Sequence, residues 1–387
     1  MKKIKFIRSR PGSSRSVSTS YKPRLGKRRL ILVGGFLGAG KTTALCRLAR
    51  YYVNKGLRVG LITNDQADNL VDTYLVKIEG FNVEEIPGGC FCCKFNDLVK
   101  AADKLISEVK PDVILAEPVG SCTDLVATVI RPLKFYHKDS YAISAYTVLL
   151  DPKRAKDIII SGKFSGFSSN VAYIFKKQLE ESNIIALNKI DTLKPGQEAK
   201  ILKALKNKFP KSRIIGISSR TGKGFDHWIK LAQSMKSGRN ILEVDYDVYA
   251  EGEAELGWLN SIAELSAKVP FSTEKFLKAL TEEIKILLNK IPAEIAHLKL
   301  ALSTSMGNSL IHLTRSSKSA EFFRKESGSS TRARLIVNAR VHTDPKLLSE
   351  LVTGALNELC KKEGVGLRIK SRQYFRPGRP VPVHRIV

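Results

Sequence analysis

The chain has 387 residues, of which 43% are hydrophobic and 26% are charged, and its formal net charge is +28. This length predicts two or three domains, and this composition excludes a chain that is disordered throughout. No run of residues approaches the roughly 18 apolar residues of a membrane helix, and no apolar stretch follows the basic N-terminus as a secretory signal requires, so we expect neither membrane spanning nor secretion.

The positive charge is concentrated at the two ends of the chain. Residues 1–29 hold eleven Lys or Arg and residues 364–387 hold six, with no acidic residue in either segment. We expect solvated tails that associate loosely with polyanions; a nucleic-acid or ribosome contact and an organelle-targeting role are the alternatives. Residues 1–28, rich in Ser, Pro and Gly, are predicted to form a disordered basic arm.

Short apolar strands alternate with helical patterns from residue 29 to residue 236. The expected strands are 30–33, 58–63, 83–86, 113–116, 142–150, 183–187 and 213–217, and the expected helices are 42–55, 96–110, 197–209 and 225–235. This alternation is typical of a doubly wound, mostly parallel sheet. Residues 29–236 are therefore predicted to form one α/β domain.

The rhythm changes after a predicted linker at residues 236–240. Strand patterns at 245–263, 297–302, 309–314, 333–341 and 366–374 surround helical patterns at 272–290 and 345–362. Residues 241–387 are therefore expected to form a smaller C-terminal α+β domain, with an exposed loop over residues 315–331.

A glycine-rich loop follows the first strand and opens the first helix. Residues 35–42 fit the pattern G-x-x-x-x-G-K-[ST], whose backbone N–H groups wrap phosphates at a helix N-terminus. Lys41 is expected to reach the β- and γ-phosphates and to act in catalysis, and Thr42 to ligate Mg²⁺. The predicted phosphate-binding residues are Gly35, Gly38, Ala39, Gly40, Lys41, Thr42 and Thr43.

Segments after two later strands predict GTP as the nucleotide, and an acid at the end of a third strand is predicted to act in hydrolysis. Asn188-Lys189-Ile190-Asp191 follows the strand at 183–187, where the Asp191 carboxylate would accept hydrogen bonds that guanine donates and adenine cannot. Ser218 and Ser219 follow the next strand, where GTPases carry a loop over the base. Glu117 ends the strand at 113–116, the position of an acid that orients the attacking water or a metal-bound water.

Three cysteines, Cys90, Cys92 and Cys93, are packed into four positions. Thiolates select Zn²⁺ and Cu⁺ and, with less preference, Co²⁺ or Ni²⁺. A closed tetrahedral site needs a fourth ligand, and none is obvious near the cluster, so we predict an open, exchangeable metal site. A redox pair and buried, inert cysteines are the alternatives. Cys46 and Cys360 are expected in the core, and Cys122 in the core or a loop.

Together these segments resemble the CobW-type metallochaperone GTPases, relatives of the HypB and UreG maturation factors for nickel enzymes. The matching segments are residues 34–43, 89–93, 117–120 and 188–191, and residues 64–72 resemble the family's switch segment. The resemblance covers about residues 29–236 and implies a P-loop GTPase domain. It also implies that Asp65 and Asp68 stand near Mg²⁺ and the transition metal, and that Asp65 acts in catalysis.

Several positions depart from the family pattern. Gln66 and Ala67 replace a Phe-Gly pair in the switch segment, Pro118 and Val119 replace a Thr-Thr pair, and Gly89 stands where Asn is usual. The C-terminal domain lacks a His-rich stretch and does not align with the family's own C-terminal domain.

The resemblance implies a cytoplasmic GTPase that uses GTP and Mg²⁺, binds Zn²⁺ or Co²⁺ at its three cysteines, and releases the metal to a client metalloenzyme or a protein of a cofactor pathway. One alternative is a GTPase that activates a corrinoid- or metal-dependent enzyme without carrying metal. The other is a nucleic-acid- or ribosome-associated GTPase that uses its basic ends. A nucleotide-dependent homodimer and weak nucleic-acid contact through the basic tails are the further partners that we consider.

Overall fold

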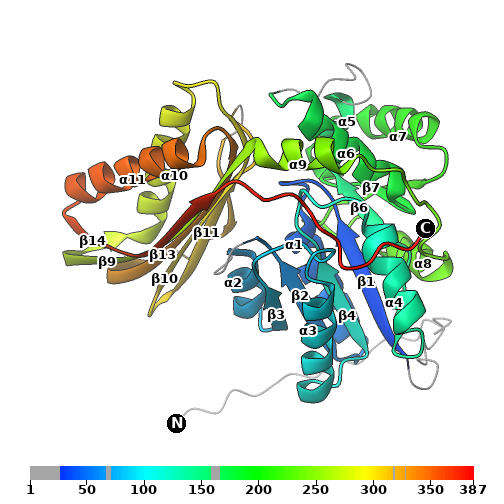
Figure 1. Ribbon diagram of the computed structural model, residues 1–387. Helices are drawn as coiled ribbons and strands as arrows, with labels where there is room; N and C mark the ends of the chain where they lie inside the picture. The colour runs from blue at the N-terminus through cyan, green and yellow to red at the C-terminus, as the bar shows by residue number, and fades with distance from the viewer. Residues whose placement is uncertain (1–26, 67–70, 158–165, 317–318, 327) are drawn as a thin grey trace, which may run out of the picture.

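A computed structural model describes residues 27–66, 71–157, 166–316, 319–326 and 328–387 (Figure 1). The predicted basic arm over residues 1–28 lies almost entirely outside the described residues. Among the helices of these described ranges, none combines the length and the apolar character that a membrane crossing needs.

The first domain is built on an eight-stranded sheet in which the paired strands run parallel. Its order is β3-β2-β4-β1-β6-β7-β8, and β5 pairs with β1. The strands are β1 (Arg28–Gly34), β2 (Val59–Asn64), β3 (Asn82–Ile86), β4 (Val113–Glu117), β5 (Tyr141–Ile143), β6 (Thr147–Leu150), β7 (Ile184–Leu187) and β8 (Arg213–Gly216). The chain order reverses at β1, so a crevice for ligands is expected beyond the carboxyl end of this strand.

Helices cover both faces of this sheet (Figure 1). The helices are α1 (Lys41–Val53), α2 (Val71–Ile78), α3 (Phe95–Glu108), α4 (Arg131–Tyr136) after a π-helical turn (Val126–Ile130), α5 (Pro152–Lys156), α6 (Ser169–Glu181), α7 (Gln197–Lys208) and α8 (Phe225–Ser234). Side chains alternate along β1: Leu30 and Leu32 pack in the core shared with α3 and α6, whereas Ile31 and Val33 pack in the core shared with α1 and α8. Burial on both faces explains the continuous apolar strands of the sequence, and the predicted doubly wound α/β fold is confirmed.

The second domain is a six-stranded antiparallel sheet in the order β12-β11-β10-β13-β9-β14. Helices α10 and α11 pack on one face of this sheet, and the other face is turned toward the first domain (Figure 1). The elements are α9 (Tyr246–Ala254), β9 (Leu256–Ser272), α10 (Thr273–Leu288), β10 (Glu294–Thr304), β11 (Gly307–Leu313), β12 (Glu321–Arg324), β13 (Ser329–His342), α11 (Pro345–Lys362) and β14 (Val365–Phe375). The predicted α+β domain is confirmed as a fold class, and its boundary near residues 236–241 stays a prediction.

Residues 245–263 do not form the single strand that the sequence pattern predicts. Asp245 caps the N-terminus of α9, because its side chain accepts hydrogen bonds from the backbone N–H groups of Asp247 and Val248. Gly252 of α9 lies so close to α6 that a Cβ there would be 2.7 Å from the carbonyl oxygen of Asn170. The contact with α6 stabilises a helix in this short segment, and the strand begins only at Leu256.

Two further expectations are corrected by the structure. The predicted strand at 142–150 is two strands, β5 and β6, separated by residues 144–146. The first pairs with the start of β1 and the second pairs with its end. The predicted exposed loop at 315–331 contains β12, which pairs with β11, and it begins with a buried Arg315 that donates to Asp151 at 2.7 Å. Long-range pairing of this kind is not visible in local patterns.

The basic C-terminal end does not form the loosely associating tail predicted from its charge. After β14 it crosses back over the first domain, where Ile386 N–H donates to Ala127 O at 2.9 Å (Figure 1). Its arginines pair with carboxylates: Arg376 with Asp344, Arg379 with Asp247, and Arg385 with Asp124. Ion pairing and packing together hold this segment in place.

The pair of Arg385 with Asp124 is expected to stabilise the protein measurably. Asp124 is 2% exposed, and its carboxylate otherwise receives a hydrogen bond only from Tyr246 OH among the described side chains, so Arg385→Met leaves a buried carboxylate poorly solvated. We expect the free energy of unfolding to fall by about 1–3 kcal/mol in urea denaturation. The matched control is Arg379→Met, because both side chains of the Arg379–Asp247 pair are more than half exposed. This variant should change the free energy of unfolding by less than about 0.5 kcal/mol. Equal effects of the two variants would contradict this anchoring.

Candidate functional site

The glycine-rich loop between β1 and α1 has the backbone that phosphate binding requires. Gly35, Gly38 and Gly40 all have positive φ angles, and a Cβ on Gly35 would lie 2.5 Å from the carbonyl oxygen of Leu149. Lys41 is buried at the start of α1, and its Nζ donates to Gly35 O at 2.9 Å across the loop. Burial lowers the pKa of Lys41, against the attraction of Glu117. The loop therefore holds its lysine inside the cradle that a phosphate chain would fill.

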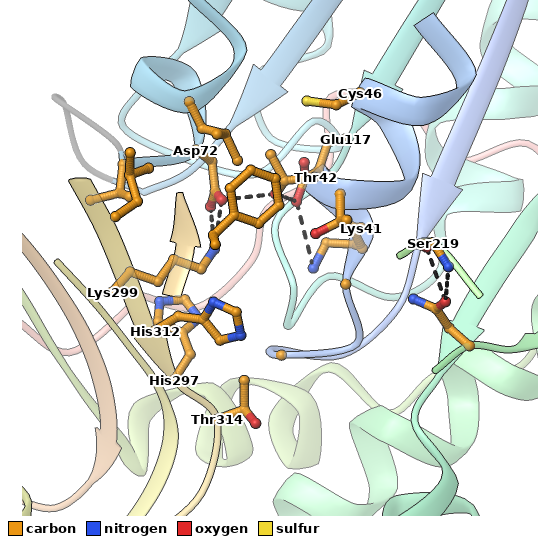
Figure 2. Close-up of a pocket in the computed structure, with 18 of the residues that line it drawn as sticks. Lys41, Thr42, Cys46, Asp72, Glu117, Ser219, His297, Lys299, His312 and Thr314 are labelled. Carbon is orange, nitrogen blue, oxygen red and sulfur yellow. Dashed lines mark hydrogen bonds and ion pairs between the residues drawn. The ribbon is translucent and has the colours of Figure 1, made fainter. Parts of the chain in front are cut away.

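Oxygen ligands gather around Thr42, the second residue of α1. Its Oγ1 lies 2.8 Å from Asp72 Oδ1 and 3.1 Å from Glu117 Oε1, and Figure 2 shows these groups together beside Lys41. Lys299 of β10 reaches the same place from the second domain and donates to both carboxylate oxygens of Asp72, at 2.7 and 2.5 Å. The site thus brings a hydroxyl, two carboxylates and two ammonium groups together.

The two carboxylates have opposite pKa shifts. Burial raises the pKa of Glu117 to about 7, and repulsion by Asp72 adds to this effect. Burial also acts to raise the pKa of Asp72, but the charge and hydrogen bonds of Lys299 and the hydrogen bond from Thr42 outweigh it and lower that pKa. Glu117 therefore titrates near neutrality while Asp72 stays ionised. No described residue donates a hydrogen bond to Glu117 Oε2, which is buried.

This donor set fits a hard divalent cation. Mg²⁺ prefers oxygen ligands, and Thr42, Asp72 and Glu117 supply them next to the phosphate cradle. Asp65, predicted from the family resemblance, is instead held by Arg340 of β13 through contacts of 2.9 and 3.0 Å. Its role as a Mg²⁺ ligand stays a prediction, and Asp68 lies outside the described residues.

The predicted base-reading residues lie at the ends of β7 and β8. Asn188 ties this region to the phosphate loop: its Nδ2 donates to Ala39 O at 2.9 Å, and its Oδ1 accepts from Ser219 N–H at 2.9 Å and from Ser219 Oγ at 3.0 Å. Lys189 Nζ donates to Gly38 O at 2.8 Å. Asp191 is exposed, and Ser218 Oγ donates to one of its oxygens at 2.6 Å. The carboxylate is thus fixed at the surface where a base would lie.

A cavity of about 660 Å³ joins the phosphate loop to the base-reading residues, and the second domain forms its opposite wall. Side chains alternate along β10: Leu298 and Leu300 pack in the core under α10 and α11, whereas His297 and Lys299 line the cavity. Figure 2 shows His312 and Thr314 facing the loop from the segment that includes β11.

This contribution of the second domain was not predicted from the sequence. Asp72 was not predicted either, because the family resemblance pointed to Asp65 and Asp68. One signal was available: polar His297 and Lys299 alternate with leucines in His-Leu-Lys-Leu-Ala-Leu, the pattern of a strand with one polar face. Nothing in the sequence showed that this face covers the phosphate loop.

The three predicted metal ligands form one cluster in the loop after β3. Cys90 Sγ lies 2.7 Å from Cys92 Sγ and 3.4 Å from Cys93 Sγ, and the sulfurs of Cys92 and Cys93 are 3.8 Å apart. Cys90 and Cys92 are buried, and Cys93 is half-buried. Their sulfurs can converge on one metal ion, and thiolates suit Zn²⁺ and other soft or borderline ions.

Of the other three cysteines, two lie in apolar cores and one lies beside the cluster. Cys46 and Cys360 lie in apolar cores, as expected, and burial raises the pKa of Cys46 to about 12 and that of Cys360 to about 11. Cys122 is buried in the loop after β4, with its Sγ 3.9 Å from Cys92 Sγ. Hydrogen bonds from Cys90 and Cys92 lower the pKa of Cys122 to about 7. The sequence analysis did not connect Cys122 with the cluster.

The C-terminal segment lies against the cysteine loop. Val381 N–H donates to Cys93 Sγ at 3.2 Å, and Val383 N–H donates to Cys92 O at 3.0 Å. His384 contacts the Phe95 ring edge to face, with ring centroids 4.9 Å apart. Residues 381–384 thus cover the cluster on one side.

Comparisons with known proteins agree with this geometry. Residues 29–215 match the family model described as CobW/HypB/UreG, nucleotide-binding domain. The chain is 29% identical over 174 residues to the zinc chaperone YeiR of Escherichia coli (strain K12). This match covers 44% of this chain and 49% of YeiR. It is 28% identical over 232 residues to the zinc chaperone CobW of Sinorhizobium sp, and this match covers 53% of this chain and 59% of that CobW. The chain therefore matches about half of the length of these relatives.

A solved structure of HypB from Helicobacter pylori in complex with nickel is also similar, at 18% identity, with 55% of this chain and 92% of that chain covered. The TM-score of this match is 0.38. The family match and the arrangement of the phosphate loop agree. Residues 29–215 are therefore a nucleotide-binding domain of the CobW/HypB/UreG family.

Proposed function

We propose that this protein is a GTPase that binds a transition metal ion at Cys90, Cys92 and Cys93 and delivers it to a client metalloprotein. The observation that carries the proposal is the position of the thiol cluster and the phosphate loop on one edge of one sheet. The names of the similar proteins, which are zinc chaperones, support the same function. The client, its cofactor pathway and a cytoplasmic location stay predictions.

The choice of GTP rests on Asp191. Its carboxylate is exposed at the cavity and held by Ser218, so it can accept hydrogen bonds from N1–H and the amino group of guanine. Adenine presents no matching pair of donors. Asn188 and Lys189 meanwhile fix the base-reading segment to the phosphate loop, so that base and phosphates are recognised in one rigid frame.

Hydrolysis is assigned to the groups around Thr42. Mg²⁺, when bound by Thr42 and a nearby carboxylate, neutralises charge on the phosphates. Lys41 withdraws charge from the β- and γ-phosphates, and Glu117 in its ionised form orients the attacking water. With a pKa of about 7, Glu117 can hold or release a proton near neutral pH.

Zn²⁺ or Co²⁺ is the proposed cargo, and its binding is expected to depend on the nucleotide through two direct links. Asn64, at the end of β2, donates from Nδ2 to Gly89 O at 2.6 Å and so connects the segment next to Asp65 with the cysteine loop. Residues 117–122 run from the nucleotide carboxylate Glu117 to Cys122 beside Cys92. Movement of either segment on nucleotide binding would alter the thiol cluster.

The alternatives make different predictions. A metal-free activator would retain client activation after Cys90, Cys92 and Cys93 are all replaced by Ser, whereas a chaperone would lose it together with zinc binding. The ion pairs of Arg376, Arg379 and Arg385 weaken the argument for nucleic-acid binding at the C-terminal end. A nucleotide-dependent homodimer is a prediction that the single chain leaves untested.

Replacing Asp191 by Asn should weaken GTP binding about ten- to a hundredfold, because a charged acceptor of two donors becomes an amide. ATP binding should change little. Fluorescence titration with both nucleotides measures this preference. Asp226→Asn, which removes the same charge from an exposed position outside the cavity, is the matched control. If the unaltered protein binds ATP and GTP equally well, Asp191 does not read the base.

Replacing Glu117 by Gln should lower the GTP turnover number about a hundredfold or more while the affinity for GTP changes by less than about tenfold. The amide keeps the size of the side chain but cannot orient water as a carboxylate does. Steady-state turnover and equilibrium GTP binding are measured on the same preparation, so binding serves as the internal control. Equal losses in both would indicate that Glu117 only holds the site together.

A further inference from the structure

A fourth sulfur lies beside the three-thiol cluster. We propose that Cys122 is a metal ligand and that Cys90, Cys92, Cys93 and Cys122 together hold one divalent ion as a four-thiolate site. This inference rests on the proposed function, because it assumes that the cluster binds metal. It changes the character of the site from open to closed, since no coordination position remains for water.

Three of the sulfur separations are close to those of a tetrahedral site. A Zn–S bond of about 2.3 Å places the sulfurs of a ZnS₄ tetrahedron ~3.8 Å apart. Cys92 Sγ lies 3.8 Å from Cys93 Sγ and 3.9 Å from Cys122 Sγ, and Cys90 Sγ lies 3.4 Å from Cys93 Sγ. The 2.7 Å separation of Cys90 and Cys92 must lengthen by ~1 Å. The sulfurs of Cys90, Cys92 and Cys93 all lie within 4.8 Å of one another in a group that does not include Cys122, so metal binding must also draw the Cys122 sulfur toward this group.

The backbone around Cys122 is held in place by hydrogen bonds. Gln178 Nε2 donates to Gly120 O and to Cys122 O, both at 2.9 Å. Thr123 N–H donates to Tyr249 OH at 3.2 Å, and Cys122 N–H donates to Val119 O at 3.0 Å. The thiol is therefore presented to the cluster by a fixed loop, which lowers the cost of ordering it when a metal binds.

Glu253 is the competing ligand. It is buried, no described residue donates to its Oε2, and its Oε1 accepts a hydrogen bond from Ser121 at 2.5 Å. Ser121 directly precedes Cys122 in the chain, so the hydrogen bond from Ser121 to Glu253 helps to fix the position of Cys122. Glu253 therefore has a positioning role. A thiolate is also the better fourth ligand for an ion already bound by three thiolates. We therefore assign coordination to Cys122.

The C-terminal segment completes the surroundings of this site. Val381 N–H donates to Cys93 Sγ, and such an N–H···S bond stabilises a thiolate that ligates metal. Because the four ligands come from the loops after β3 and β4, release of the ion requires these loops to separate. The loop after β4 begins at Glu117, so separation can follow a change at the nucleotide.

X-ray absorption on the full chain loaded with Zn²⁺ tests the assignment directly. We expect four sulfur neighbours at about 2.3 Å in the unaltered protein and about three in Cys122→Ala. Zinc affinity in that variant should fall at least about tenfold. Cys360→Ala, which removes a core cysteine outside the cluster, should keep four sulfur neighbours and full affinity.

Three sulfur neighbours with one oxygen or nitrogen in the unaltered protein would overturn the assignment; loss of that oxygen in Glu253→Gln would place the carboxylate there instead. This measurement needs no variant, so it stands even if Cys122→Ala fails to fold. If the unaltered protein retains no zinc, the proposed metal function itself fails, which is a different result from a three-sulfur site.

Discussion

The parallel order of the first sheet is the constraint on which both sites depend. Because β1, β2, β3, β4, β7 and β8 run in one direction, the loops that follow them gather at one edge. The phosphate loop, the switch segment, the cysteine loop, Glu117 and the base-reading residues each follow one of these strands. Groups that are up to about 180 residues apart in the sequence therefore meet without any long connecting segment.

The second domain adds positive charge to this edge. Lys299 pairs with Asp72, and the fully buried Arg340 pairs with Asp65 and lies over the Trp258 ring at 3.9 Å from its centroid. Removing Asp65 from its pair with the buried Arg340 would typically cost about 3–5 kcal/mol, because the remaining charge stays unpaired. The two carboxylates of the switch region therefore tie the C-terminal sheet to the nucleotide site. A change of nucleotide that moves either carboxylate must also act on the second domain.

The fold class was predictable from the sequence because buried parallel strands and their helices leave local patterns. Leu30 to Val33 and the alternating helices showed the first sheet, and Asp344 with Pro345 showed the start of α11. The glycine-rich loop and the position of Asp191 at the cavity were predictable because each lies within a short segment. Contacts between distant segments were not: Lys299 with Asp72, Arg340 with Asp65 and Cys122 with Cys92 depend on how two domains and two loops pack. The positive charge of residues 364–387 led to the wrong prediction of a loosely associating tail, because composition does not show which carboxylates the arginines of this segment contact.

We propose that the nucleotide and the metal ion are bound by one coupled structure. The affinity of the full chain for Zn²⁺ can be measured in three states: nucleotide-free, with GDP, and with Mg²⁺ and a non-hydrolysable GTP analogue. We expect the GTP-like state to bind Zn²⁺ about five- to 150-fold more tightly than the GDP state, and Zn²⁺ to tighten binding of the analogue by the same factor. Identical zinc affinity in all three states would contradict this proposal.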